Sequence, residues 1–209
     1  MRPLLLVALA LSGSLAAQYR YPKHTFTVGG GAAQPRAHLE PLLKDSGVFS
    51  FGYGYRLHRY IQADVGLDTI FYAARVRDFL DSSTFGPLRI RDYQFLIPFG
   101  ARAILPVDRG GRFLLSGGGG GARLQYSELL RQPGEYYNLD CYVCNSRGGW
   151  GYYGLVGGSV ALDRYKHFRV GVIGKVYQGH TKGDPIGAVP PFRTRDRWAN
   201  VMGEFGVSF

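Results

Sequence analysis

The last twelve residues, Trp198-Ala-Asn-Val-Met-Gly-Glu-Phe-Gly-Val-Ser-Phe209, alternate between two kinds of side chain. The apolar parity consists of Ala199, Val201, Phe205, Val207 and Phe209. The opposite parity carries polar groups, among them Glu204. A period of two predicts a β-strand with one apolar face. In a soluble protein this strand would end on an exposed aromatic ring beside a free carboxylate, which is an awkward combination.

The beginning of the chain has the pattern of a signal peptide. A positive pair, Met1-Arg2, precedes an apolar run, Leu4 to Leu11, that is too short to span a bilayer. Small residues follow, as at a cleavage site. The pattern predicts a signal peptide over residues 1–17 and one mature domain over residues 18–209, with cleavage after Ala16 or after Ala17 left open.

Composition predicts an all-β fold for the mature domain. The 209 residues include 31 Gly, 15 Tyr and 13 Phe, and the mean hydropathy is −0.10. No apolar run after the leader is long enough for a transmembrane helix, which excludes a helical membrane protein. The net charge of +10 would ordinarily suggest nucleic acid as a partner. Export makes that partner improbable.

Eight segments of the chain show strand-like periodicity. The predicted strands are 24–34, 48–57, 60–73, 90–105, 112–127, 149–163, 167–178 and 195–209. The long connectors between them are 35–47, 74–89, 128–148 and 179–194, and they alternate with short connectors. This alternation predicts an eight-stranded antiparallel up-and-down barrel, with both chain ends on the short-turn side.

The polarity of the strands predicts a barrel that is apolar outside. In strand 90–105 the charged residues Asp92 and Arg102 oppose a run of apolar side chains. A soluble, lipocalin-like barrel would have the reverse polarity, with apolar residues inside. Strands 112–127 and 149–163 carry apolar groups on both parities, so their faces stay open.

The inward parity predicts a network of charges in the lumen. Its members are Arg56, Asp64, Asp68, Arg102, Arg123, Lys175 and Glu204. The same face is expected to carry Asp92, Gln125 and Arg169. Because an unpaired buried charge costs several kcal/mol, we expect these groups to pair across the interior or to hold water. Eight strands leave little open width, so structural filling is favoured over a conducting pore.

The signal peptide, the alternating strands and the terminal segment together resemble the small outer-membrane β-barrel family, the eight-stranded OmpA/OmpX-like group. The resemblance implies a monomeric transmembrane barrel in the outer membrane of a Gram-negative-type bacterium, with short periplasmic turns and four long extracellular loops. It also implies insertion by the outer-membrane assembly machinery, which would read the last strand through Phe205, Val207 and Phe209.

Cys141 and Cys144 form the single cysteine pair, in the third long connector. Exported proteins meet an oxidising compartment, so a loop disulfide is expected. Half of a zinc site and a redox motif are the alternatives. Zinc needs further ligands, and none is spaced nearby, whereas a redox motif would normally open a helix in a βαβ setting, which is absent here. No metal and no cofactor are expected.

Three classes of function remain open. The leading one is a non-enzymatic barrel that serves envelope integrity or surface interaction through its extracellular loops. The second is a narrow pore or small-molecule transporter. The third is a lipid A modifying enzyme, built on His180-Thr181 with Asp184 or Asp196 as the acid. Basic groups at the external rim also predict contact with outer-membrane lipids and lipopolysaccharide: Arg75, Arg77, Arg89, Arg91, Lys182, Arg193, Arg195 and Arg197.

Overall fold

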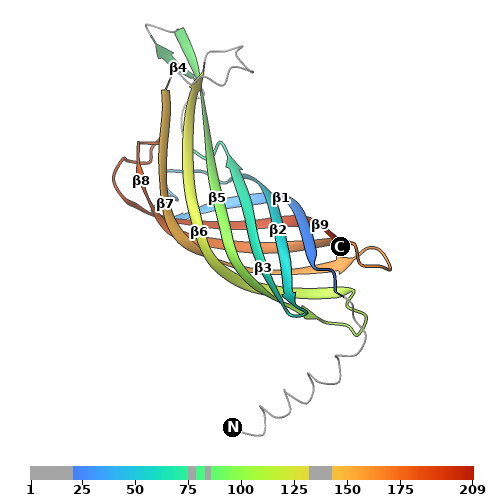
Figure 1. The fold of residues 1–209 in the computed structure, drawn as a ribbon. Coiled ribbons are helices and arrows are strands. Elements are labelled where there is room, and N and C mark those ends of the chain that lie inside the picture. Colours follow the sequence, from blue (N-terminus) through green and yellow to red (C-terminus); the bar gives the residue numbers. More distant parts are fainter. Residues whose placement is uncertain (1–20, 75–78, 83–85, 132–142) are drawn as a thin grey trace, which may run out of the picture.

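A computed structural model describes residues 21–74, 79–82, 86–131 and 143–209. The strands are β1 (His24–Ala37), β2 (Ser46–His58), β3 (Ile61–Phe71), β4 (Phe79–Ser82), β5 (Gly86–Pro106), β6 (Phe113–Arg131), β7 (Val143–Ala161), β8 (Phe168–Gly183) and β9 (Thr194–Ser208). Sequence neighbours other than β3 and β4 pair antiparallel, β1 pairs with β9, and β3 pairs with β5. These last two pairings close a ring of eight strands, and β4 pairs with β5 beside that ring (Figure 1). The predicted all-β, eight-stranded antiparallel barrel is therefore confirmed.

Among the described residues, no helix is long and apolar enough to cross a membrane. Each of the eight predicted strands overlaps one strand of the ring. Tight curvature is possible where β5, β6 and β7 meet because β6 contains the glycine run 117–121. A Cβ on Gly118 would lie 2.2 Å from the carbonyl oxygen of Ala101, and one on Gly120 would lie 2.3 Å from that of Phe99. Neither position has room for a side chain.

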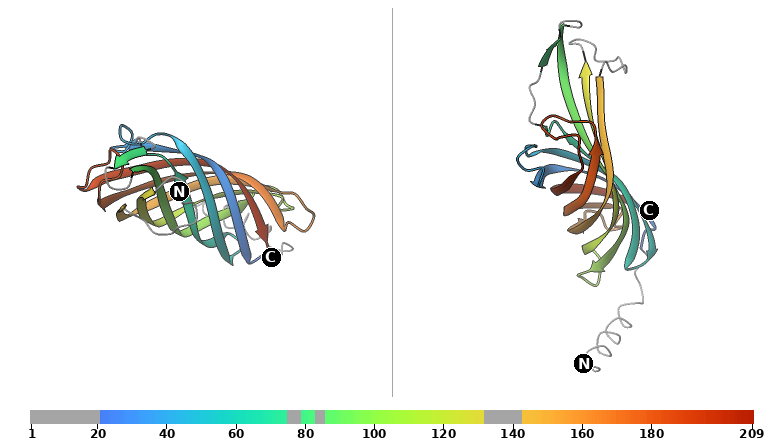
Figure 2. Two further views of the ribbon diagram at one scale, coloured as in Figure 1. Left: turned by 90° about the horizontal axis from the view of Figure 1, so that it is seen from above. Right: turned by 90° about the vertical axis from the view of Figure 1, so that its left-hand side faces the viewer.

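Several strands extend beyond the predicted limits, among them β1, which ends at Ala37, and β8, which ends at Gly183. β5 begins at Gly86, β6 ends at Arg131 and β7 begins at Val143, so strand pairing occupies parts of the segments 74–89 and 128–148 that we expected to be loops. The short strand β4 was also missed. The sequence there is rich in charge and turn residues, but cross-strand pairs such as Ile90 with Leu130 continue the sheet. Figures 1 and 2 show the extended ends of β5, β6 and β7 standing beyond the rest of the barrel.

The outer face is apolar along the strands. Phe51, Leu57, Val65, Leu105, Val172 and Val201 are each about half or more exposed and point away from the lumen. The structure also assigns the two strands whose faces stayed open. In β6, Leu115 points outward and Leu114 inward, and in β7, Tyr152 points outward and Tyr153 inward.

Aromatic clusters lie at both ends of this apolar face. At the short-turn end the rings of His24, Phe26, Tyr53, Tyr55 and Phe209 form contacts with centroids 5.0 to 6.1 Å apart. At the other end Phe71, Tyr72, Tyr93 and Phe95 lie 5.7 to 6.3 Å apart. An apolar band between two aromatic girdles is typical of barrels that span a bilayer.

Two of the short turns share one construction. Asp108 accepts hydrogen bonds from the backbone N–H of Phe113 at 2.7 Å, and Asp163 accepts one from that of Phe168 at 2.9 Å. In the first turn the Phe113 amide lowers the pKa of Asp108. Gly111 and Lys166 occupy equivalent places, three residues after each aspartate, and both have φ of 64°. In this left-handed backbone conformation the Cβ of lysine is sterically unfavourable, whereas glycine has no Cβ.

Candidate functional site

The middle of the lumen is organised around Asp68, which is fully buried. Its Oδ1 accepts from Lys175 Nζ at 2.8 Å and from Ser50 Oγ at 2.6 Å. Its Oδ2 accepts from the hydroxyl of Tyr177 at 2.7 Å and, more weakly, from the amide of Asn200 at 3.4 Å. The carboxylate is therefore satisfied from four sides, and the cluster closes the middle of the barrel.

A second ion pair lies nearer the short-turn end. Arg102 Nε donates to Asp64 Oδ2 at 2.6 Å, and Gln62 donates to Oδ1 of the same carboxylate at 2.7 Å. Arg56 is buried and Glu204 faces the same space. The structure thus brings six of the seven predicted network residues into the lumen.

Arg123 is the exception, and its inward placement was wrong, as was that of Gln125. In β6 the inward parity carries Leu124 and Tyr126, both buried, so Arg123 lies on the outer face. Its guanidinium stacks 5.1 Å from the ring of Trp150 and donates to Gln125 at 3.3 Å. The glycine run 117–121 has no side chains from which the parity could be followed, and this is why the prediction failed.

The loop end of the lumen is filled by apolar side chains that sequence reasoning did not identify. The connector 38–45 contributes Leu39 and Leu43, and the connector 184–193 contributes Ile186 and Val189. All four are at most 1% exposed, and they pack in one core cluster with Trp198 of β9. These two connectors therefore form a cap over the lumen.

Arg147 anchors the cap, and it too was missed because it fell in a predicted loop. It is 1% exposed, and it donates to Thr181 Oγ1 at 2.9 Å, to Thr194 Oγ1 at 2.8 Å and to the carbonyl of Pro190 at 2.5 Å. Both threonine hydroxyls donate in turn to Asp196 at 2.6 Å. The carboxylate balances the guanidinium through one intervening hydroxyl.

The His180-Thr181 pair does not assemble as an enzymatic site would require. Thr181 points into the lumen and is used by Arg147 and Asp196, whereas His180 is exposed on the outer face of β8. Adjacent strand residues point to opposite faces, so this histidine cannot take a proton from this hydroxyl. Among the described residues, no group of histidine, cysteine and acidic side chains could hold a metal ion.

Exposed basic side chains gather on the outer face toward the loop end. We call this set, together with the half-buried Arg123 of β6, the basic band: Arg36 of β1, His180 and Lys182 of β8, and Arg195 and Arg197 of β9. The register places Arg36 opposite Arg197 and His180 opposite Arg195. Two guanidinium groups placed directly opposite each other, as Arg36 and Arg197 are, destabilise a sheet. The band extends the predicted rim residues Lys182, Arg195 and Arg197 across four strands.

The remaining predicted residues divide into two groups. Phe205 and Phe209 are exposed on the outer face of β9, and Val207 shares their parity. Their reading by the assembly machinery stays a prediction. Cys144 lies in β7 and Cys141 lies outside the described residues, as do Arg75 and Arg77, so the loop disulfide stays a prediction as well.

A closed antiparallel barrel with an apolar outer face and a polar, filled interior is the architecture of a transmembrane β-barrel. Solved structures with the same fold are small outer-membrane barrels. The attachment invasion locus protein Ail of Yersinia pestis matches with a TM-score of 0.52 and 12% identity over 91% of this chain and 100% of that one. OprG of Pseudomonas aeruginosa gives 0.53 and 13% over 90% and 97%, and the neisserial surface protein NspA gives 0.51 and 13% over 89% and 97%.

Ail has also been solved in complex with the heparin analogue sucrose octasulfate. No protein-family model matches the chain, and no curated protein matches it by sequence. The likeness is one of fold. The chain has the fold of the eight-stranded outer-membrane β-barrels, with an apolar outer face between two aromatic girdles.

Proposed function

We propose that this barrel is a non-enzymatic envelope protein that binds phosphate groups of the outer-leaflet glycolipid, lipopolysaccharide, along the basic band. One observation carries the proposal: the band places two guanidinium groups, Arg36 and Arg197, directly opposite each other, and Arg195 lies on the neighbouring pair position of β9. Such pairs cost stability when they face water, and phosphates between them reverse the sign of the interaction.

The position of the band fits a lipid headgroup. Below it on the same face of β8 and β9 the side chains are apolar, among them Val176 and Val201. The guanidinium of Arg123 lies over the ring of Trp150, and an arginine on the lipid face is tolerated near an interface far better than at mid-membrane. The band therefore lies at the border between hydrocarbon and headgroups.

The filled lumen favours a function that is performed by the outer surface of the barrel. The cap formed by the connectors 38–45 and 184–193, together with the Asp68 cluster, fills the loop half of the interior. Surface interaction is then left to the band and to the projecting ends of β5, β6 and β7. Loops and edges on a rigid scaffold are common places for recognition.

The test compares two lipids and two pairs of substitutions. The refolded protein is mixed with bisphosphorylated lipid A or with dephosphorylated lipid A, and unfolding is followed by the heat-dependent shift in gel migration. We expect the bisphosphorylated lipid to raise the unfolding temperature by about 5 °C, which corresponds to about 2 kcal/mol in a domain of this size. The double variant Arg195→Gln/Arg197→Gln should lose most of this gain.

The control is Lys44→Gln/Arg164→Gln, which removes two exposed basic residues outside the band. It should keep the full gain. Without lipid the band variant should be as stable as the wild type or slightly more so, because it relieves repulsion. Equal stabilisation by both lipids would contradict the proposal, and so would a response to sucrose octasulfate without one to lipid A.

A further inference from the structure

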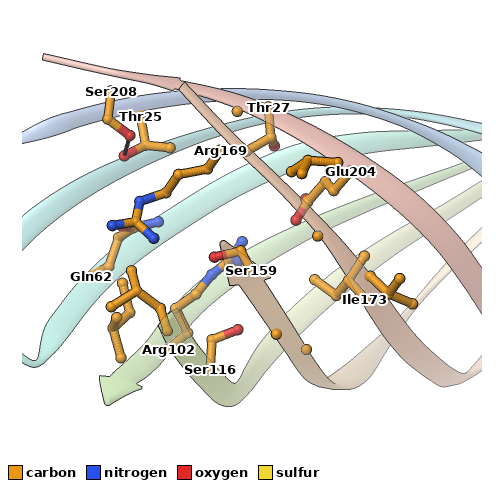
Figure 3. Close-up of a pocket in the computed structure, with 18 of the residues that line it drawn as sticks. Thr25, Thr27, Gln62, Arg102, Ser116, Ser159, Arg169, Ile173, Glu204 and Ser208 are labelled. Carbon is orange, nitrogen blue, oxygen red and sulfur yellow. Dashed lines mark hydrogen bonds between the residues drawn. The ribbon is translucent and has the colours of Figure 1, made fainter. Parts of the chain in front are cut away.

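The short-turn half of the lumen differs from the capped half because it holds a polar cavity. The cavity has a volume of about 60 Å³, and a second one of about 130 Å³ lies at the periplasmic mouth. The two cavities share Arg56, Ile104 and Leu114 in their walls, so the inner one is reached from the periplasmic end. Figure 3 shows the inner cavity with Arg102 and Arg169 pointing into it.

The charges that line this cavity are mainly positive. Arg56, Arg102 and Arg169 face it, and Glu204 is the lining carboxylate. Arg102 uses its Nε for Asp64, and within the described residues its terminal nitrogens form no further hydrogen bond. Three guanidinium groups therefore face one space that is enclosed by the barrel wall.

The hydrogen bonds of Arg169 go to neutral acceptors. The residue is 7% exposed, and its terminal nitrogens donate to the backbone carbonyls of Gly111 at 2.8 Å and Arg112 at 3.3 Å. Both acceptors are neutral, so they orient the guanidinium without cancelling its charge. Glu204 faces the same cavity, is half-buried, and interacts electrostatically with Arg102.

Hydroxyl groups from four strands also line the cavity, beside apolar residues such as Ile104 and Ile173. The hydroxyl groups belong to Thr25, Thr27, Ser116, Ser159 and Ser208. Arginine and hydroxyl groups that converge on one small space are the donors that bind a tetrahedral or planar oxyanion. We infer that the periplasmic half of the lumen is a binding site for a small oxyanion of the size and charge of inorganic phosphate, separate from the basic band.

The experiment measures phosphate binding to the refolded protein in detergent micelles by titration calorimetry. We expect saturable binding of inorganic phosphate at one site. Glu204→Gln should tighten it about tenfold, because the substitution removes the lining carboxylate that repels the anion. Arg164→Gln removes a guanidinium from a periplasmic turn without touching the cavity, and it should leave phosphate affinity unchanged.

A variant that fills the cavity tests whether phosphate needs its open space as well as its charged side chains. A Cβ on Gly206 would lie 3.4 Å from the nearest atom, a methyl group of Thr27, so Gly206→Val can occupy the cavity with every arginine in place. It should weaken phosphate binding at least tenfold while the heat-dependent gel shift shows a folded barrel. Comparison of phosphate with glycerol phosphate and acetate tells a free ion from the head of a larger ester or a carboxylate.

Failure of any saturable binding by wild type and Glu204→Gln would overturn the inference, as would equal affinity in Gly206→Val. None of these outcomes bears on the lipid A proposal, because Glu204 and Gly206 lie inside the barrel and the basic band lies outside it. Stabilisation by lipid A should be the same in Glu204→Gln as in the wild type.

Discussion

Asp68 is the residue on which the middle of the lumen depends. Its carboxylate is 0% exposed and accepts from Lys175, Ser50, Tyr177 and Asn200. The presence of a buried acid on this strand could be predicted from alternation alone. Its partners could not, because Lys175 lies 107 residues away and cross-barrel contacts leave no local trace in sequence.

We expect Asp68→Asn to destabilise the barrel by about 3 kcal/mol, because the Lys175 ammonium would then be buried without an anion. The measurement is urea unfolding of the refolded protein in micelles. Asp68→Asn/Lys175→Met removes both charges and should recover most of the loss. If the two substitutions simply added their costs, the ion pair would not be the source of the effect.

Arg147 has the same importance for the cap. Its donors reach the carbonyls of Pro190 and Phe192 as well as two threonine hydroxyls. Arg147 was not predicted as a lumen residue because it lies in a segment predicted to be a loop. The sequence also did not show which face of β7 points inward, because Tyr152 and Tyr153 are adjacent and both apolar. The structure resolves this by placing only Tyr153 inward.

Arg147→Met should loosen the connector 184–193 without opening the ring of strands. Trypsin cleavage after Arg193 should become several-fold faster, since a peptide bond must leave its hydrogen-bonded setting to enter a protease. Mass spectrometry of limited digests measures the rate. Unchanged cleavage, with the rest of the barrel intact, would show that Ile186 and Val189 hold the cap by packing alone.

At the scale of elements, the periodicity of the eight strands predicted the ring. The predicted limits of several strands at the loop end of the barrel were wrong. Period-two alternation carries through β2, β3 and β9 because each has one polar and one apolar face. It fails in β6, where glycines 117–121 remove the signal and Arg123 was misplaced as a result. The outer ends of β5 to β7 were missed because pairing across strands, which single-segment patterns do not contain, holds them.

The two turns with a common design give a prediction at this scale. Lys166 has the same φ, 64°, as Gly111 in the equivalent turn. Lys166→Gly should raise the unfolding temperature by about 2 °C, since relief of the left-handed strain exceeds the added flexibility of glycine in the unfolded chain. Gly111→Ala is the reverse change and should lower it by a similar amount. Opposite signs in both variants would contradict this reading of the turns.

At the scale of the whole molecule, the two halves of the lumen and the outer face differ in their side chains. The loop half of the lumen is packed, the short-turn half holds a cavity faced by three arginines, and the outer face carries an apolar band beneath basic side chains. Composition and alternation were enough to predict a membrane barrel with polar groups inside. The division of the lumen was not predictable, because it depends on which connectors fold inward, and Leu39, Leu43, Ile186 and Val189 show no period.

Because its lumen is packed, the barrel should not conduct ions. Planar-bilayer recording on the purified, refolded wild-type protein tests this. Because the Asp68 cluster and the cap fill the interior in series, the bilayer should stay silent after insertion, at either sign of the applied voltage. Insertion itself is verified by the heat-dependent gel shift of protein recovered from the same preparation. Discrete, reproducible conductance steps from the folded barrel would show an open path through these residues and would contradict a closed, surface-acting protein.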